Sequence, residues 1–180
     1  MAISTMVSTI TPETIKNAFK EIMDHEAQHV SFFETALKRA GVTPRPKPTF
    51  KGLQHADLDD FIAMSCKLEN AGVGAFLMAM PAISDPTATA AAASIVTIEA
   101  RHAGFVNALL GKPLSESGAF DKPISQTAIV DAVSPFIDSL NGGPNPADEL
   151  SSDPVILNFA LLLEHLEAEF YRVNVPKLFE

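Results

Sequence analysis

Two Glu-x-x-His pairs are the residues of this chain whose types and spacing are best suited to chemistry. They are Glu26 with His29 and Glu99 with His102. Residues three positions apart in a helix lie on the same face. Each pair therefore offers a carboxylate and an imidazole side by side, an arrangement that can hold a metal ion.

Both pairs continue the apolar face of the segment that carries them. The first pair lies within the apolar series from Phe19 to Leu37, and the second lies within the series from Ile95 to Leu109. We therefore expect all four polar side chains to point into the protein. A buried carboxylate is costly unless it is paired or bound to a metal, so these groups require partners.

Two further glutamates on other apolar segments supply such partners. Glu69 follows Leu68 on the inner side of its segment, and Glu164 continues the face of Leu157 and Leu161. One glutamate from each of two helices, with one Glu-x-x-His pair from each of the other two, is the ligand pattern of dinuclear carboxylate sites in helical bundles. Carboxylates with imidazoles suit iron or manganese, with zinc as an adventitious occupant. The predicted ligands of two metal ions are Glu26, His29, Glu69, Glu99, His102 and Glu164.

Other polar residues near these positions leave alternatives open. Glu167, one turn beyond the last of the six, is a ligand, a group that supports a ligand, or an exposed or bridging charge. Tyr171 either donates a hydrogen bond to a ligand carboxylate or places its ring in the core with its hydroxyl at the rim. His25 and His165 are expected to lie off the inner face, in contact with water.

The segments that must position these residues read as four long helices. Capping residues followed by proline, as in Thr11-Pro12 and Asp85-Pro86, favour helix starts. We expect helices at about residues 12–40, 57–80, 86–110 and 154–173, with Pro176 ending the last one. The stretch 112–145 is expected to be mostly loop with one short helix at about 127–137. The prediction is an all-α, antiparallel four-helix bundle with an extra short helix, in one domain spanning residues 1–180.

Composition excludes several classes of function. The length of 180 residues suits one domain, and 47% hydrophobic residues provide a core. A net charge of −9 disfavours nucleic acid and anionic membrane surfaces, and no apolar run is long enough to span a membrane. Cys66 is a single cysteine, expected to be a small buried residue, so no internal disulfide forms. The N-terminus does not read as a signal peptide, which favours a cytoplasmic location and leaves secretion open.

Four phrases of the sequence together resemble the ferritin-like family that includes desiccation-related and fungal stress-associated proteins. They are residues 24–30 (DHEAQHV), 68–73 (LENAGV), 98–102 (IEARH) and 157–171 (LNFALLLEHLEAEFY). The resemblance implies a ferritin-like four-helix bundle with a dinuclear ligand set. In that family the helix similar to residues 157–171 comes first, whereas here it comes last. The resemblance thus implies a circular permutation through residues 141–148, with a closed monomer expected and a domain-swapped dimer as the alternative.

Three functions remain open at this point. The first is a dinuclear metalloenzyme, an oxidoreductase acting on dioxygen or peroxide or oxidising a small organic substrate. The second is a metal-binding stress protein without an organic substrate, which the resemblance implies most directly. The third is a structural bundle whose ligand set is vestigial. Residue types alone indicate no catalytic residue and do not choose between iron and manganese.

Overall fold

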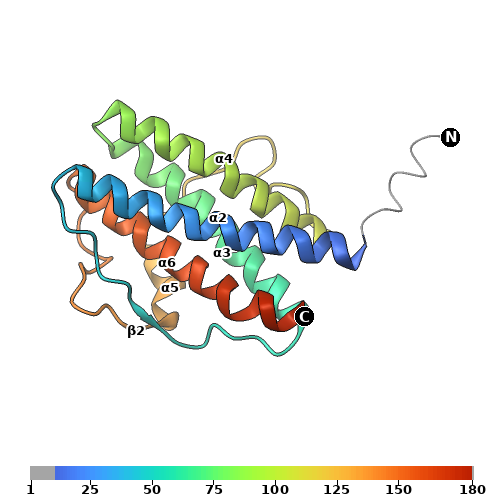
Figure 1. Ribbon diagram of the computed structural model, residues 1–180. Helices are drawn as coiled ribbons and strands as arrows, with labels where there is room; N and C mark the ends of the chain where they lie inside the picture. The colour runs from blue at the N-terminus through green and yellow to red at the C-terminus, as the bar shows by residue number, and fades with distance from the viewer. Residues whose placement is uncertain (1–10, 180) are drawn as a thin grey trace.

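Four long helices form a bundle in the computed structural model, which describes residues 11–179 (Figure 1). They are α2 (Pro12–Arg39), α3 (Leu58–Ala79), α4 (Pro86–Leu109) and α6 (Asp153–Leu178). The prediction of an all-α fold is confirmed, and three of the helices begin and end within one residue of the expected positions. Within residues 11–179, no helix has both the length and the apolar character that a membrane span requires.

The expected caps explain where the first and third of these helices begin. The Thr11 hydroxyl accepts a hydrogen bond from the Thr14 N–H at 3.2 Å, and the Asp85 carboxylate accepts one from the Thr87 N–H at 2.7 Å. Each cap satisfies a backbone donor that the first helical turn leaves without a partner. Proline follows both caps, where its missing N–H costs nothing.

The last helix extends beyond its predicted end. Pro176 lies inside α6, which continues to Leu178. The ring of Phe179 stacks on Phe19 with centroids 5.4 Å apart, and the Phe179 N–H donates to the Val175 carbonyl at 3.2 Å. These contacts hold the final turn although proline removes one helical hydrogen bond, so the prediction that Pro176 ends the helix is wrong.

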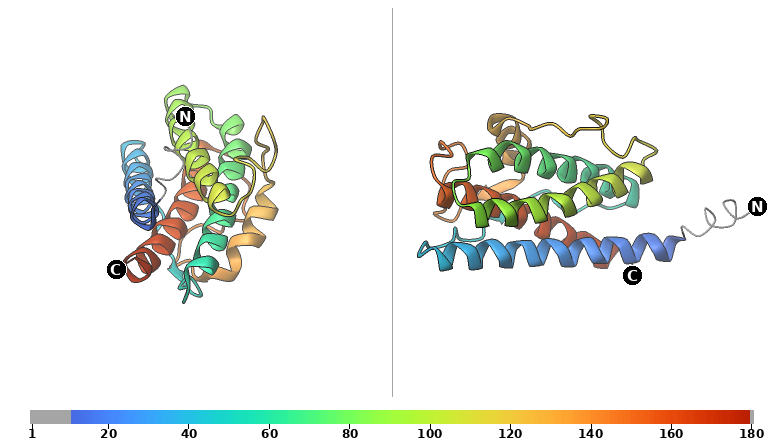
Figure 2. Two further views of the ribbon diagram at one scale, coloured as in Figure 1. Left: turned by 90° about the vertical axis from the view of Figure 1, so that its right-hand side faces the viewer. Right: turned by 90° about the horizontal axis from the view of Figure 1, so that it is seen from above.

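The helices pack as two antiparallel pairs, α2 with α6 and α3 with α4 (Figures 1 and 2). A turn of 3-10 helix, η2 (Met80–Ala82), connects α3 to α4. Between α2 and α3 the chain instead returns along the whole length of the bundle, so these two helices run in the same direction. This crossover is fixed to α6 by buried Arg45, whose backbone N–H donates to Asn158 Oδ1 at 2.7 Å.

The second long connection contains more regular structure than the sequence predicted. Helix α5 (Gln126–Val133) is followed by a 3-10 turn, η3 (Ser134–Phe136), and by strand β2 (Ile137–Ser139). The expected helix at 127–137 therefore ends early, because Pro135 disfavours helix at and before its own position. Strand β2 pairs antiparallel with β1 (Thr49–Phe50), which ties the two long connections together, whereas no strand was expected.

Two apolar clusters fill the bundle on either side of a polar layer. One cluster contains Phe19, Phe61 and Phe170, and the other contains Phe33 and Leu161. On α2, Glu26 and His29 lie between the residues of the two clusters in chain order, and on α4 Glu99 and His102 do the same. The packing therefore separates this layer from water at both ends.

Candidate metal centre

Six buried side chains meet in the polar layer. The pair Glu26 and His29 comes from α2, the pair Glu99 and His102 from α4, Glu69 from α3 and Glu164 from α6. All four glutamates are at most 1% exposed, and the histidines are 8% and 5% exposed. The six predicted ligands thus come together inside one chain.

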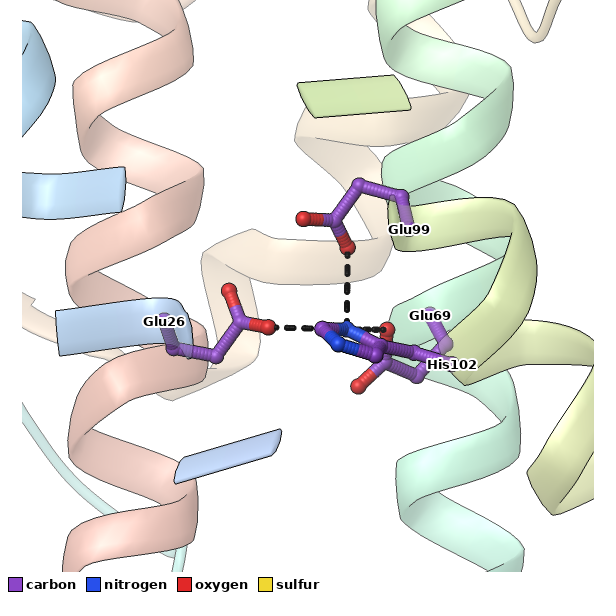
Figure 3. Close-up of side chains that lie close together, drawn as sticks. All are labelled: Glu26, Glu69, Glu99 and His102. Carbon is purple, nitrogen blue, oxygen red and sulfur yellow. Dashed lines mark ion pairs between the residues drawn. The ribbon is translucent and has the colours of Figure 1, made fainter. Parts of the chain in front are cut away.

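The six residues form two overlapping groups of four. One group is Glu26, Glu69, Glu99 and His102 (Figure 3), and the other is Glu26, His29, Glu99 and Glu164. Within each group, one donor atom from every residue lies within 4.8 Å of the others. Glu26 and Glu99 belong to both groups.

Both imidazoles present Nδ1 to the carboxylates. His102 Nδ1 lies 3.0 Å from Glu26 Oε1 and 3.3 Å from Glu69 Oε2. His29 Nδ1 lies 2.9 Å from Glu99 Oε1 and 3.3 Å from Glu164 Oε2. Each histidine therefore faces carboxylates from more than one helix through the same ring nitrogen.

Burial and close charges perturb the protonation of both histidines. Burial alone would lower the pKa of His29, but its contacts with the carboxylates of Glu164, Glu26 and Glu99 outweigh burial and raise the pKa to about 12. The pKa of His102 is likewise raised to about 12, since its carboxylate contacts outweigh burial. Without a metal, both rings are therefore positively charged imidazolium groups at neutral pH.

The carboxylates divide according to which effect dominates. Burial raises the pKa of Glu69 to about 8, and burial also raises the pKa of Glu164 well above its usual value. Burial acts on Glu99 in the same sense, but the two nearby imidazoles outweigh it and lower the pKa of Glu99 to about 2. In the absence of a metal, protons on the histidines and on the acids with raised pKa therefore offset part of the negative charge of this layer.

The polar atoms of the layer suit a metal ion. Eight of its buried side-chain atoms lie within ion-pair distance of one another but make no hydrogen bond of acceptable geometry to any described residue. They are both carboxylate oxygens of Glu26 and of Glu99, Oε2 of Glu69 and of Glu164, and Nδ1 of His29 and of His102. Buried polar atoms almost always have partners, so a layer with this many open donor atoms matches a site for cations. Carboxylate oxygens with imidazole nitrogens suit iron or manganese.

Tyr171 supports one of the predicted ligands directly. It is fully buried, its hydroxyl donates to Glu69 Oε1, and it lies 2.5 Å from Ser65 Oγ. Burial, followed by the negative charge of Glu69, raises the pKa of Tyr171, so it remains a neutral donor. Of the two predicted alternatives, the structure therefore shows the hydrogen bond to a carboxylate and excludes a hydroxyl at the rim.

Glu167 is a buried acid beside the layer, which excludes the exposed alternative. It is 4% exposed and belongs to neither group of four. A Cβ at Gly72 would lie 3.3 Å from Glu167 Oε1 and 3.7 Å from Glu99 Oε2, so the missing side chain at Gly72 makes room for this carboxyl group. Burial, then repulsion by Glu99 and Glu26, raises the pKa of Glu167 well above its usual value.

The expectation that His25 and His165 are solvated is wrong for His165 and incomplete for His25. His165 is 4% exposed because α6 is covered on almost all sides, and burial lowers its pKa to about 4. The His25 side chain is 32% exposed, but its Nδ1 lies 3.0 Å from His102 Nε2 and the two rings stack. Its position one turn before His29 was the available signal. Cys66 is buried as expected, and its thiol donates to Asn107 Oδ1.

A buried layer of four glutamates and two histidines in a four-helix bundle defines a helical protein with a candidate dinuclear metal centre. A family model described as a ferritin-like domain matches residues 2–112, and the chain belongs to this family. The matched region contains five of the six residues, and Glu164 lies beyond it. A search of curated proteins and a search of solved structures found no match.

Proposed function

We propose that this protein binds two metal ions, iron or manganese, in the polar layer. The observation that carries the proposal is the pair of four-residue groups that share Glu26 and Glu99. His29 and Glu164 would complete one position, and His102 and Glu69 would complete the other. The ligand types and their origin on four helices correspond to dinuclear carboxylate sites in bundles.

A bound pair of ions of this kind supplies one- and two-electron chemistry with dioxygen or peroxide. The residues of this chain provide the surroundings for that chemistry. The two apolar clusters keep water from both ends of the layer. Tyr171 orients Glu69 through its hydroxyl, and His25 orients His102 through the outer ring nitrogen.

Within this class we favour a stress-related role in metal binding or in the chemistry of dioxygen or peroxide. The resemblance to desiccation-related and stress-associated proteins supports this choice. The second candidate is an oxidase or oxygenase acting on a small organic substrate, because an apolar cleft reaches His102 from the surface. The third candidate is a structural bundle with a vestigial site, and metal analysis distinguishes it from the other two.

Metal content tests the proposal most directly. Protein purified without chelator should contain about two iron or manganese ions per chain, and an absorption change should follow anaerobic reduction and exposure to oxygen. Glu99→Gln removes a shared carboxylate and should lose most of the metal. Glu34→Gln is the matched control, because Glu34 lies on α2 outside the polar layer and forms a surface ion pair with Lys38. Wild-type protein that holds neither metal, even after loading, would favour the structural alternative.

We further propose that the helix order is a circular permutation of the family's order. Three observations support it: the family match ends before α6, a long crossover joins α2 to α3, and the start of α2 packs against the end of α6 through Phe19 and Phe179. A rearranged chain, with the α6 segment linked ahead of α2 and the loop at residues 141–148 opened, should fold and bind the same amount of metal. Failure to fold would argue against the permutation while leaving metal binding by the natural chain unaffected.

A further inference from the structure

A surface cleft of about 180 Å³ lies between α2 and α4 and reaches the polar layer. Its walls are mainly apolar and are formed by Ala18, Ile22, Ile98 and Phe105. Glu21 and Arg101 also line it, with opposite charges. A route for metal cations would favour several carboxylates, whereas here the single carboxylate is offset by the guanidinium group.

His102 belongs both to this cleft and to the candidate metal centre. Its Nδ1 faces Glu26 at 3.0 Å, while its Nε2 faces His25 Nδ1 at 3.0 Å. The His25 ring stacks on His102 at a centroid distance of 5.3 Å and also lines the cleft. One imidazole ring therefore separates the cleft from the carboxylates.

We propose that this cleft binds a small, single-ring aromatic molecule next to His102. An apolar cavity of about 150 Å³ lined by Leu, Ile and Phe side chains is sufficient to bind benzene. The cleft offers a comparable volume, aliphatic walls from Ile22 and Ile98, and one aromatic ring from Phe105. The polar edge formed by His25 and Arg101 accommodates one polar substituent on the ring.

The proposal that an aromatic molecule binds depends only on the shape and lining of the cleft. Its role as the substrate of a dinuclear centre rests on the proposed function. If both hold, the aromatic ring lies against His102, one imidazole ring away from the metal centre.

Benzene is the probe for the test, titrated into the full chain after chelator treatment and followed by NMR of the histidine rings. Saturable binding should shift the ring resonances of His25 and His102, assigned with His25→Gln. Ala18→Leu adds three carbons at the wall of the cleft and should weaken binding at least tenfold. Ala27→Leu is the matched control, since Ala27 is an exposed alanine on the same helix and does not line the cleft.

Several results would overturn the inference: no saturable binding by the wild type, equal binding by Ala18→Leu and wild type, or shifts confined to residues far from His25. If Ala18→Leu fails to fold, Ile98→Phe replaces it as the blocking variant. Metal content measured on the same preparations separates the two proposals. If the protein binds two metals but no benzene, the aromatic site is wrong and the proposed function stands. If it binds benzene but no metal, the proposed function is wrong and the aromatic site stands.

Discussion

Metal binding by this protein should release protons, because the metal-free layer holds several of them at neutral pH. The raised pKa values of His29, His102 and Glu69, at about 12, 12 and 8, keep all three groups protonated at pH 7. Burial also favours the protonated form of Glu164. Ligation requires neutral imidazole and ionised carboxylate, so loading the layer should release about three protons or more per chain.

The same shifts give the stability of the metal-free protein a definite pH dependence. A group whose pKa is higher in the folded state stabilises that state fully below its unfolded pKa and loses this contribution as pH rises through the folded pKa. The window runs from 4.5 to about 8 for Glu69 and from 6.5 to about 12 for His29 and His102. Glu99 acts in the opposite sense, but only below pH 4.5 and down to about 2. The lowered pKa of His165 also acts in the opposite sense, from about pH 4 to 6.5, where the contribution of Glu69 offsets it. The metal-free protein should therefore lose stability between pH 5 and 8.

The metal-loaded protein should show the opposite trend, because fewer protons compete with the metal as pH rises. With free metal at a hundred times Kd, binding stabilises the fold by about 2.7 kcal/mol. For a domain of this length each kcal/mol corresponds to about 2–4 °C, so the Tm should rise by about 5–11 °C. The gap between loaded and metal-free melting temperatures should widen from pH 5 to pH 8.

Two measurements check this expectation. Mn²⁺ is titrated into chelator-treated protein in weak buffer at pH 7 with a pH indicator, and thermal melts of both forms are recorded from pH 5 to 8. Glu34→Gln should release the same number of protons as the wild type. Binding of Mn²⁺ without proton release, or a gap in Tm that stays constant with pH, would refute the assignment of protons to this layer.

Three further expectations concern the support of the layer and the assembly. Tyr171→Phe removes the hydroxyl that donates to Glu69, and it should weaken metal affinity about 10–100-fold in a metal titration. Gly74→Ala would place a Cβ 2.4 Å from the Ile124 side chain and should cost about 1–3 kcal/mol in chemical unfolding. Gly104→Ala, with its nearest contact at 3.6 Å, should not destabilise the protein, and a loss equal to that of Gly74→Ala would contradict the steric argument. Light scattering should give the mass of one chain, because α6 completes the layer within its own chain; a stable dimer would contradict this.

The sequence by itself was sufficient for features that depend on local spacing. Glu26 and His29 are three residues apart within an apolar series, and Glu99 and His102 repeat the pattern, so helical geometry alone places each pair on an inner face. Capping followed by proline located the starts of α2 and α4. These features need only a few neighbouring residues, which is why the helices and the six candidate ligands could be predicted.

Only the tertiary structure decided features that depend on which helices surround a residue. His165 adjoins Glu164 in the sequence, and no local pattern shows that α6 is covered on nearly all sides. Glu167 is buried because Gly72, on another helix, leaves space for its carboxyl group. The last turn of α6 persists past Pro176 because Phe179 packs on Phe19, more than a hundred residues away in the chain. Burial and electrostatics at such positions depend on residues that are distant in the sequence, and the pattern of residues along one helix does not show which of them will be neighbours.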